Sequence, residues 1–162
     1  MGRQRKTQIS GRQSAREVFV TRVNLHAKHV VDDYQCQRCA NSVEDRNHVF
    51  FGCSSSSELW RVMGLSHISL LSDDEVWNAN APPGLDASIW PFVFLTILWR
   101  LWDDRNGQVF RNETSCSRVV ISRVCDDLVV WRKRLHPDLV NSLDGWRSFL
   151  LDCTGTAFAH SG

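Results

Sequence analysis

The sequence predicts a mainly α-helical protein with one loop held by a metal ion. In the second half, apolar side chains recur at the three- and four-residue spacing of a helix, and no stretch alternates as a strand would. Cysteine and histidine gather within residues 36–53. The 162 residues, 43% of them hydrophobic, suffice for one cored domain or for a domain plus a small module.

The expected elements follow in chain order. Residues 1–18 are polar and basic and are expected to form a disordered arm. A short helical pattern then places Val18, Val23 and Leu25 on one face. The metal-binding module spans residues 19–71. Within it, Ser55 and Glu58 have the spacing of a capping box, which predicts a helix opening there and running to about Gly64.

The second half predicts a linker and three helices. Residues 72–88 are acidic, then rich in Pro and Gly, and are expected to be a surface linker before a helical domain at 89–151. The first helix should begin near Ser88 and reach at least Arg105, and the second should begin near Thr114 or Ser115. The second helix carries one apolar stripe predicted to face the core: Val120, Val124, Leu128, Trp131 and Leu135. Pro137 should end it, a last helix should cover about 138–151, and residues 152–162 are expected to be a disordered tail.

Charge and targeting signals give further expectations. The net charge is +1, yet residues 1–28 carry seven basic side chains and one acid, which leaves the remainder at −5. No secretory signal precedes them, and the longest apolar run, 90–102, is shorter than the ~20 residues of a membrane span. We therefore expect an intracellular protein without a membrane partner, and the nucleus is one compartment in which it could occur. In a reducing compartment the six cysteines should not be read as disulfides.

The cysteine and histidine spacing is Cys36-x2-Cys39-x8-His48-x4-Cys53. Ligand type and spacing match structural zinc sites, in which four N or S atoms form a tetrahedron. Residues five apart on an ideal helix point about 140° from each other, so the backbone should break between His48 and Cys53, with Gly52 supplying the freedom. The alternatives are cysteines buried as small apolar side chains or a redox C-x2-C pair, although the redox reading leaves His48 and Cys53 idle.

Several stretches together resemble a known family. TRVNLHAKHV, CQRC, EDRNHVFFGC and the Trp seven residues beyond the last Cys are similar to the zinc-binding domain of plant reverse transcriptases from non-LTR (LINE-type) retrotransposons. ILWRLWDDRNGQVF resembles the Trp-Arg-Asn block that follows it, and WRKRL and DGWRSFL resemble the C-terminal ends of grass elements. The likeness covers about residues 19–151, and its C-x2-C…E…H-x4-C pattern is fairly specific in combination with the block.

The resemblance implies that Cys36, Cys39, His48 and Cys53 are the zinc ligands. Its second block corresponds to Trp99, Trp102, Arg105, Asn106 and Phe110. We expect the three aromatic residues of this block in the core, and Arg105 and Asn106 at a helix end. The chain departs from the family before TRVNL, where the family has a Trp- and Phe-rich helix, and at Asp103 and Asp104, where it is often basic. Because no polymerase palm and no ribonuclease H carboxylate set is present, the chain looks like the detached C-terminal end of a retroelement polyprotein and is not expected to be an enzyme.

Three functions remain in competition. The first is a zinc-stapled module that binds RNA or single-stranded DNA weakly, through the basic side chains of the arm: Arg3, Arg5, Lys6, Arg12 and Arg16. The second is a structural or protein-interaction helical domain, including a remnant without present activity. The third is an enzyme, for which scattered Asp and His, such as His26 and His29, are the sole support.

Overall fold

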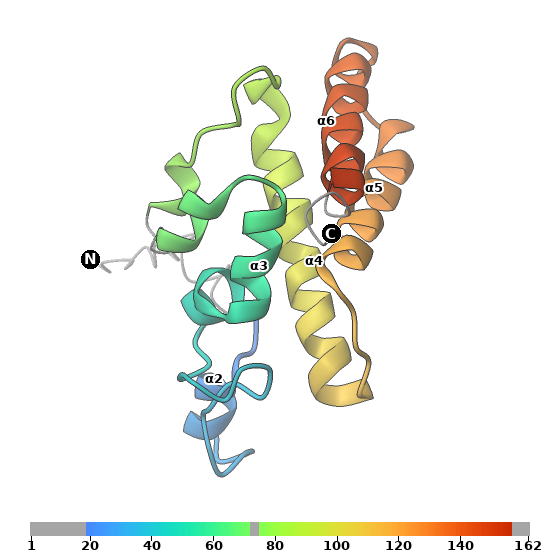
Figure 1. The fold of residues 1–162 in the computed structure, drawn as a ribbon. Coiled ribbons are helices and arrows are strands. Elements are labelled where there is room, and N and C mark those ends of the chain that lie inside the picture. Colours follow the sequence, from blue (N-terminus) through green and yellow to red (C-terminus); the bar gives the residue numbers. More distant parts are fainter. Residues whose placement is uncertain (1–18, 72–74, 157–162) are drawn as a thin grey trace, which may run out of the picture.

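The computed structural model describes residues 19–71 and 75–156, and these parts are helical and contain no strand (Figure 1). The N-terminal half has α2 (Arg22–Ala27), a π-helix η1 (His48–Gly52), α3 (Ser54–Val62) and the 3₁₀ turn η2 (Ser66–Leu70). Two further turns, η3 (Val76–Asn78) and η4 (Ala87–Ile89), lead into three longer helices: α4 (Trp90–Arg111), α5 (Ser117–Arg132) and α6 (Pro137–Thr156). The predicted mainly α fold class is confirmed.

Helix α4 lies between the N-terminal half and the α5–α6 pair (Figure 1). A continuous series of aromatic contacts crosses the molecule at this point. Phe51 beside the metal loop stacks on Trp60 of α3, and Trp60 stacks on Phe94 of α4 at 5.7 Å between ring centroids. Phe94 contacts Trp90, which stacks on Trp146 of α6 at 5.1 Å. Both halves therefore contribute to one hydrophobic core.

The segment expected as a surface linker also contributes to this core. Val76 is buried, and Leu85 packs against the core from outside. The indole N–H of Trp90 donates to the carbonyl of Ala79 (2.7 Å), and that of Trp146 donates to the carbonyl of Asp86 (2.9 Å). The large indoles thus hold the connection through their only polar atom.

Several helix ends differ from those expected. Ser55 lies inside α3, whose N-cap is Cys53, and Glu58 pairs with Arg61 and so forms no capping box. Helix α5 ends at Arg132, before Pro137, which instead begins α6 because proline is tolerated in a first helical turn. Helix α6 continues to Thr156, so residues 152–156 are helical and not tail, while 157–162 lie outside the described residues.

The predicted α5 stripe is confirmed at Val120, Val124 and Leu128, which are buried. The prediction that Trp131 faces the core is wrong. Its side chain is 41% exposed, with its ring edge-to-face with Phe92 and the Arg134 guanidinium over it. The helix passes the edge of the core before this last turn, and regular spacing carries no signal of where the core ends.

The aromatic residues of the second block also divide. Trp102 is buried as expected, against Phe19 and Phe50, but Trp99 and Phe110 are 51% and 65% exposed. Cys125 of α5 is buried. No described helix has the length and apolar character needed to cross a bilayer.

Candidate metal centre

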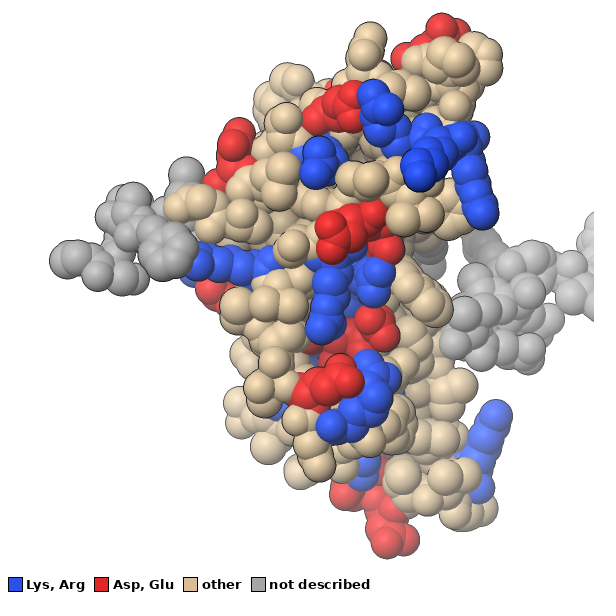
Figure 2. Space-filling model, turned by 90° about the vertical axis from the view of Figure 1, so that its right-hand side faces the viewer, with Lys and Arg blue, Asp and Glu red and all other residues tan. Residues whose placement is uncertain are grey.

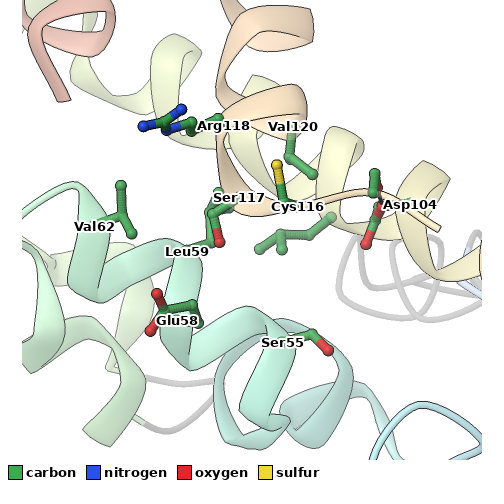
Figure 3. Close-up of a pocket in the computed structure, with 11 residues that line it drawn as sticks. Ser55, Glu58, Leu59, Val62, Asp104, Cys116, Ser117, Arg118 and Val120 are labelled. Atoms are coloured by element: carbon green, nitrogen blue, oxygen red, sulfur yellow. Dashed lines mark hydrogen bonds between the residues drawn. The ribbon is translucent and has the colours of Figure 1, made fainter. Parts of the chain in front are cut away.

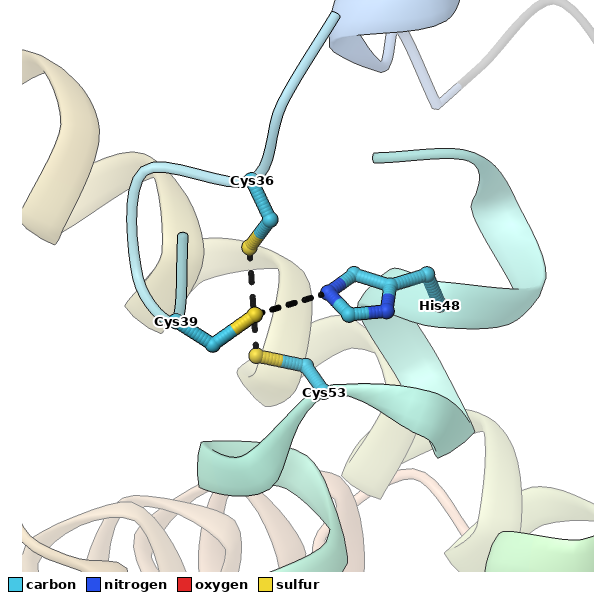
Figure 4. A group of neighbouring side chains, drawn as sticks. All are labelled: Cys36, Cys39, His48 and Cys53. Atoms are coloured by element: carbon cyan, nitrogen blue, oxygen red, sulfur yellow. Dashed lines mark hydrogen bonds between the residues drawn. The ribbon is translucent and has the colours of Figure 1, made fainter. Parts of the chain in front are cut away.

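The four predicted ligands converge (Figure 4). Their ligand atoms all lie within 4.8 Å of one another. The Sγ atoms of Cys36 and Cys53 are 3.9 Å apart, and Cys39 Sγ is 3.3 Å from His48 Nε2. A tetrahedron with Zn–S bonds of about 2.3 Å has S–S edges of ~3.8 Å, so the arrangement fits zinc. Because all four side chains meet, His48 and Cys53 are not idle, as a redox C-x2-C pair would leave them.

A tight turn positions the first two ligands. The backbone N–H of Ala40 donates to the Cys36 carbonyl (2.8 Å), and Ala40 adopts φ +54°. The N–H of Cys36 in turn donates to the carbonyl of Ser42 (2.9 Å), beside a bridge between Gln35 and Val43. The chain therefore folds back across the turn and leaves both thiols on its inner side.

A π-helix positions the other two ligands. The Cys53 N–H donates to the His48 carbonyl (2.7 Å), an i→i+5 bond in which residues five apart come close to alignment. The expected interruption of regular α-helix is present, but it arises from the π-helix and not from the conformational freedom of Gly52. Gly52 is not among the described residues with positive φ, and the backbone becomes extended at Cys53 (φ −69°, ψ 139°). Asp45 Oδ1 accepts the His48 N–H (2.7 Å) and holds the start of the turn.

Two of the thiols differ in acidity. The hydrogen bond from Cys53 lowers the pKa of Cys36 to about 3. The same bond and burial raise the pKa of Cys53 above its ordinary value. Since zinc binds thiolates, metal binding would take the proton that this pair shares and release it to solvent.

A buried ion pair ties the loop to α4. Glu44 and Arg105 are both 0% exposed, and the guanidinium of Arg105 binds the carboxylate of Glu44 through two nitrogens, one of them Nε at 3.2 Å. Glu44 also accepts the backbone N–H of Arg22 (3.0 Å), at the start of α2. The expectation that Arg105 and Asn106 end a helix is wrong, because both lie inside α4, where Asn106 accepts a bond from Arg105 (2.9 Å).

A second ion pair between the loop and α4 lies next to the first, with the basic residue now on the loop and the acidic residue on α4. Arg38, between the first two ligands, donates to the carbonyl of Val49 (2.9 Å) and to the hydroxyl of Ser56 (3.3 Å). Its other terminal nitrogen lies 4.0 Å from Asp104, an ion pair without a hydrogen bond, and Asp104 accepts a hydrogen bond from the hydroxyl of Ser115. Neighbouring residues of α4, Asp104 and Arg105, thus hold Arg38 and Glu44 of the loop. We call these four residues the α4 clamp.

The clamp is the part of the site that sequence reasoning missed. Glu44 is the glutamate of the C-x2-C…E…H-x4-C pattern, and Arg105 belongs to the second block, but nothing paired them. The signal was available: Arg105 follows Leu101 at i+4, on the buried side of an apolar helix, where an arginine requires a carboxylate partner.

The remaining candidate residues lie elsewhere. Arg3, Arg5, Lys6, Arg12 and Arg16 lie outside the described residues. His26 packs on Tyr34, with ring centroids 5.2 Å apart. Asp33 accepts a bond from Arg22 (2.9 Å), which lowers the pKa of that carboxyl.

A groove of about 470 Å³ opens between α3 and the start of α5 (Figure 3). Leu59, Leu101 and Val120 contribute apolar side chains to it, whereas Glu58 and Arg118 contribute opposite charges. The lining of the groove therefore carries both positive and negative charge and does not form a patch of a single sign.

Comparison with known proteins agrees with this geometry. Residues 4–60 match the family described as zinc-binding in reverse transcriptase. This part of the chain is therefore similar to a zinc-binding domain of the reverse-transcriptase type. The match begins upstream of residue 19, where the resemblance was placed, so it includes most of the basic arm as well as all four ligands.

A longer plant protein is also similar. The chain is 26% identical over 110 residues to an Arabidopsis thaliana protein named "Putative ribonuclease H protein At1g65750". The alignment covers 62% of this chain and 17% of that protein, so the chain spans about a sixth of the relative's length. No solved structure matches the chain.

Proposed function

We propose that the chain is a non-catalytic zinc module that binds single-stranded RNA or DNA weakly, with its affinity supplied by the basic arm. The observation that carries this proposal is the extent of the zinc-binding domain. Because one family match covers residues 4–60, every basic residue of the arm except Arg3 lies in the same matched region as the zinc ligands. The proposal also places the chain inside the cell, with the nucleus as a compartment where such ligands occur.

The ligand set supports a structural role for zinc. Three thiolates and one imidazole complete a tetrahedron, whereas catalytic zinc sites keep a position open for water or substrate. Cys36, His48 and Cys53 are buried, which further separates the ion from solvent. The metal would therefore hold the loop in shape and activate no water.

The charges of the described body support the arm as the source of affinity. Arginines of the body pair with carboxylates, as in Arg22–Asp33, Arg100–Asp127 and Arg132–Asp144. In Figure 2, Lys and Arg side chains lie among Asp and Glu along much of the visible face. Residues 1–18, by contrast, hold five basic side chains and one acid. Phosphate binding releases counterions in proportion to the number of cations that reach the phosphates.

A structural or protein-interaction domain is the second candidate. The exposed apolar side chains of α4, above all Trp99, favour it, because contiguous exposed apolar surface marks interaction sites. This candidate predicts no binding to RNA or DNA even at low salt.

Binding to labelled single-stranded RNA over a range of salt concentrations separates the two. With about four to six cations at phosphates, the log–log slope should be roughly −3 to −4. Deleting residues 1–16 should remove most of the binding and leave zinc content unchanged. Replacing Arg12 and Arg16 by Gln should weaken binding, while the control pair Lys133→Gln and Arg134→Gln, in the turn directly after α5, should not. Absence of binding by the full chain at low salt would refute the proposal, and binding that survives the deletion would refute the role of the arm.

A further inference from the structure

A hollow of about 440 Å³ opens on the surface beside the metal centre, and one of the three thiols of the centre lines it. Cys39 is half-buried and borders this hollow together with His48. Cys36 and Cys53 do not line it and are 1% and 0% exposed. A small molecule in solvent therefore reaches the sulfur atoms of the centre at Cys39 first.

The walls of the hollow are mostly small and polar. Its uncharged polar side chains come from four residues: Asn41, Ser42, Asn47 and Ser54. Gly52 leaves one wall without a side chain, and a Cβ added there would lie 3.5 Å from Nδ1 of His48. Because Asp45 adds a carboxylate, the hollow suits a small neutral polar molecule better than an anion.

We propose that Cys39 is a site of oxidation by hydrogen peroxide, and that the product is a disulfide with Cys36 that removes both ligands from the zinc ion. Peroxide reacts with the thiolate form of cysteine, which is also the form that binds zinc. The other two sulfur atoms lie within 4.8 Å of the Cys39 sulfur. An accessible thiolate with a second thiol beside it is the arrangement of redox-sensitive sites.

The reaction has two steps, and one peroxide molecule supplies both. The Cys39 thiolate first attacks one peroxide oxygen, so that an S–O bond forms, the O–O bond breaks and hydroxide leaves a sulfenic acid behind. The Cys36 thiolate then attacks the Cys39 sulfur, the S–S bond forms, and the S–O bond breaks to release a second hydroxide. The two thiolates lose two electrons in total, and the two hydroxide ions take up protons from solvent to give water.

The backbone favours Cys36 over Cys53 as the second sulfur. The N–H of Ala40 donates to the Cys36 carbonyl (2.8 Å), so a turn closed by a backbone hydrogen bond holds the C-x2-C pair together independently of a metal. Cys53 belongs to a different segment, at the N-cap of α3. After oxidation His48 and Cys53 remain, and two ligands do not complete the tetrahedron of a structural zinc site.

Titration of the full zinc-bound chain with hydrogen peroxide tests the proposal, with released zinc followed by a colorimetric indicator. About one zinc per chain should be released, and a thiol reductant should restore zinc binding. Trypsin cleaves after Arg38 and Arg46, which puts the three thiols on separate peptides. The peptide of Cys39 should be linked to that of Cys36, and dimedone, which traps sulfenic acids, should label Cys39. Linkage through Cys53, or a first label on another ligand, would overturn the assignment.

Substitutions outside the ligands test the route through the hollow. Gly52→Val should slow zinc release several-fold with the initial zinc content unchanged, and Gly52→Ala replaces it if the larger side chain lowers that content. Gly145→Val on α6, where nothing lies within 4 Å of an added Cβ, is the control and should react like the parent. Equal rates at the two positions would refute the route.

Cys116 gives an internal reference in the same titration, because it is exposed and lies outside the metal cluster. Zinc release should be unchanged in Cys116→Ser. Oxidation of Cys116 in the parent chain while zinc stays bound and Cys39 stays reduced would overturn the proposal.

Discussion

At the scale of single residues, the least expected feature is the pair of opposite charges in the α4 clamp. Glu44 and Arg105 come from positions 61 residues apart, and both are fully buried. Such a pair adds little relative to a well-packed apolar pair, but removing one partner leaves the other charged and desolvated. The clamp therefore specifies where the loop sits on α4.

Glu44→Gln should consequently lower the free energy of unfolding by about 3–5 kcal/mol, because Arg105 stays buried without its counter-charge. The double variant Glu44→Gln with Arg105→Met should recover much of the loss. Urea unfolding measures both. The control is Glu58→Gln at the exposed Glu58–Arg61 pair, which should change stability little. Equal effects at the buried and exposed pairs would contradict the clamp.

Cys125 gives stability a dependence on alkaline pH. Burial raises the pKa of this thiol from 9.0 to about 11. The folded chain thus holds its proton more tightly than the unfolded chain. The contribution is complete below about pH 9 and is lost as pH rises through 11. Two pKa units correspond to about 2–3 kcal/mol. The stability difference between the parent and Cys125→Ala should shrink by that order between about pH 8.5 and 11, and a constant difference would exclude the shift.

At the scale of elements, the π-helix η1 and helix α4 position the metal site. The π-helix brings His48 and Cys53 to the same side, and its Val49, Phe50 and Phe51 are buried in the core. Helix α4 binds the loop through one side and leaves Leu95 and Trp99 half-exposed on another. Because α4 packs against both the N-terminal half and α5, its buried residues do not form a single narrow stripe. This explains why the aromatic residues of α4 divide between core and surface.

The tryptophans of the last two helices should differ sharply in their effect on stability. Trp146→Ala removes a fully buried ring stacked on Trp90 and should cost about 3–5 kcal/mol. Trp131→Ala, at a 41% exposed ring on the edge of the core, should cost much less. Thermal or urea unfolding of the two variants side by side gives the comparison. A larger loss for Trp131 would place the core boundary elsewhere on α5.

At the scale of the whole molecule, the shared core makes the metal site and the long helices depend on one another. The contacts from Phe51 to Trp146 cross both halves, and structural zinc contributes its binding energy to folding. Removing zinc with a chelator should therefore lower the melting temperature of the helices as well as disorder the loop. Circular dichroism at 222 nm follows the helices, and limited proteolysis follows residues 30–60. Helices that melt at the same temperature with and without zinc would show that the halves are independent.

The sequence predicted much of this molecule because the relevant signals are local. Four ligands within 18 residues, and apolar side chains repeating along α5 and α6, need no knowledge of distant contacts. The clamp and the exposure of Trp99, Phe110 and Trp131 depend on which elements meet, and a periodic pattern gives a face without giving its neighbour. The continuation of α6 to Thr156 escaped for a related reason, since residues 152–156 are mostly small or polar and lack an apolar repeat.

The central claim is that one zinc ion is bound by Cys36, Cys39, His48 and Cys53, and X-ray absorption at the zinc edge of the purified protein tests it most directly. The account predicts about one zinc per chain, with three sulfur neighbours at about 2.3 Å and one nitrogen at about 2.0–2.1 Å. His48→Ala should remove the nitrogen neighbour or the metal itself. A protein that purifies without zinc, or a shell made mainly of oxygen and nitrogen, would contradict the account.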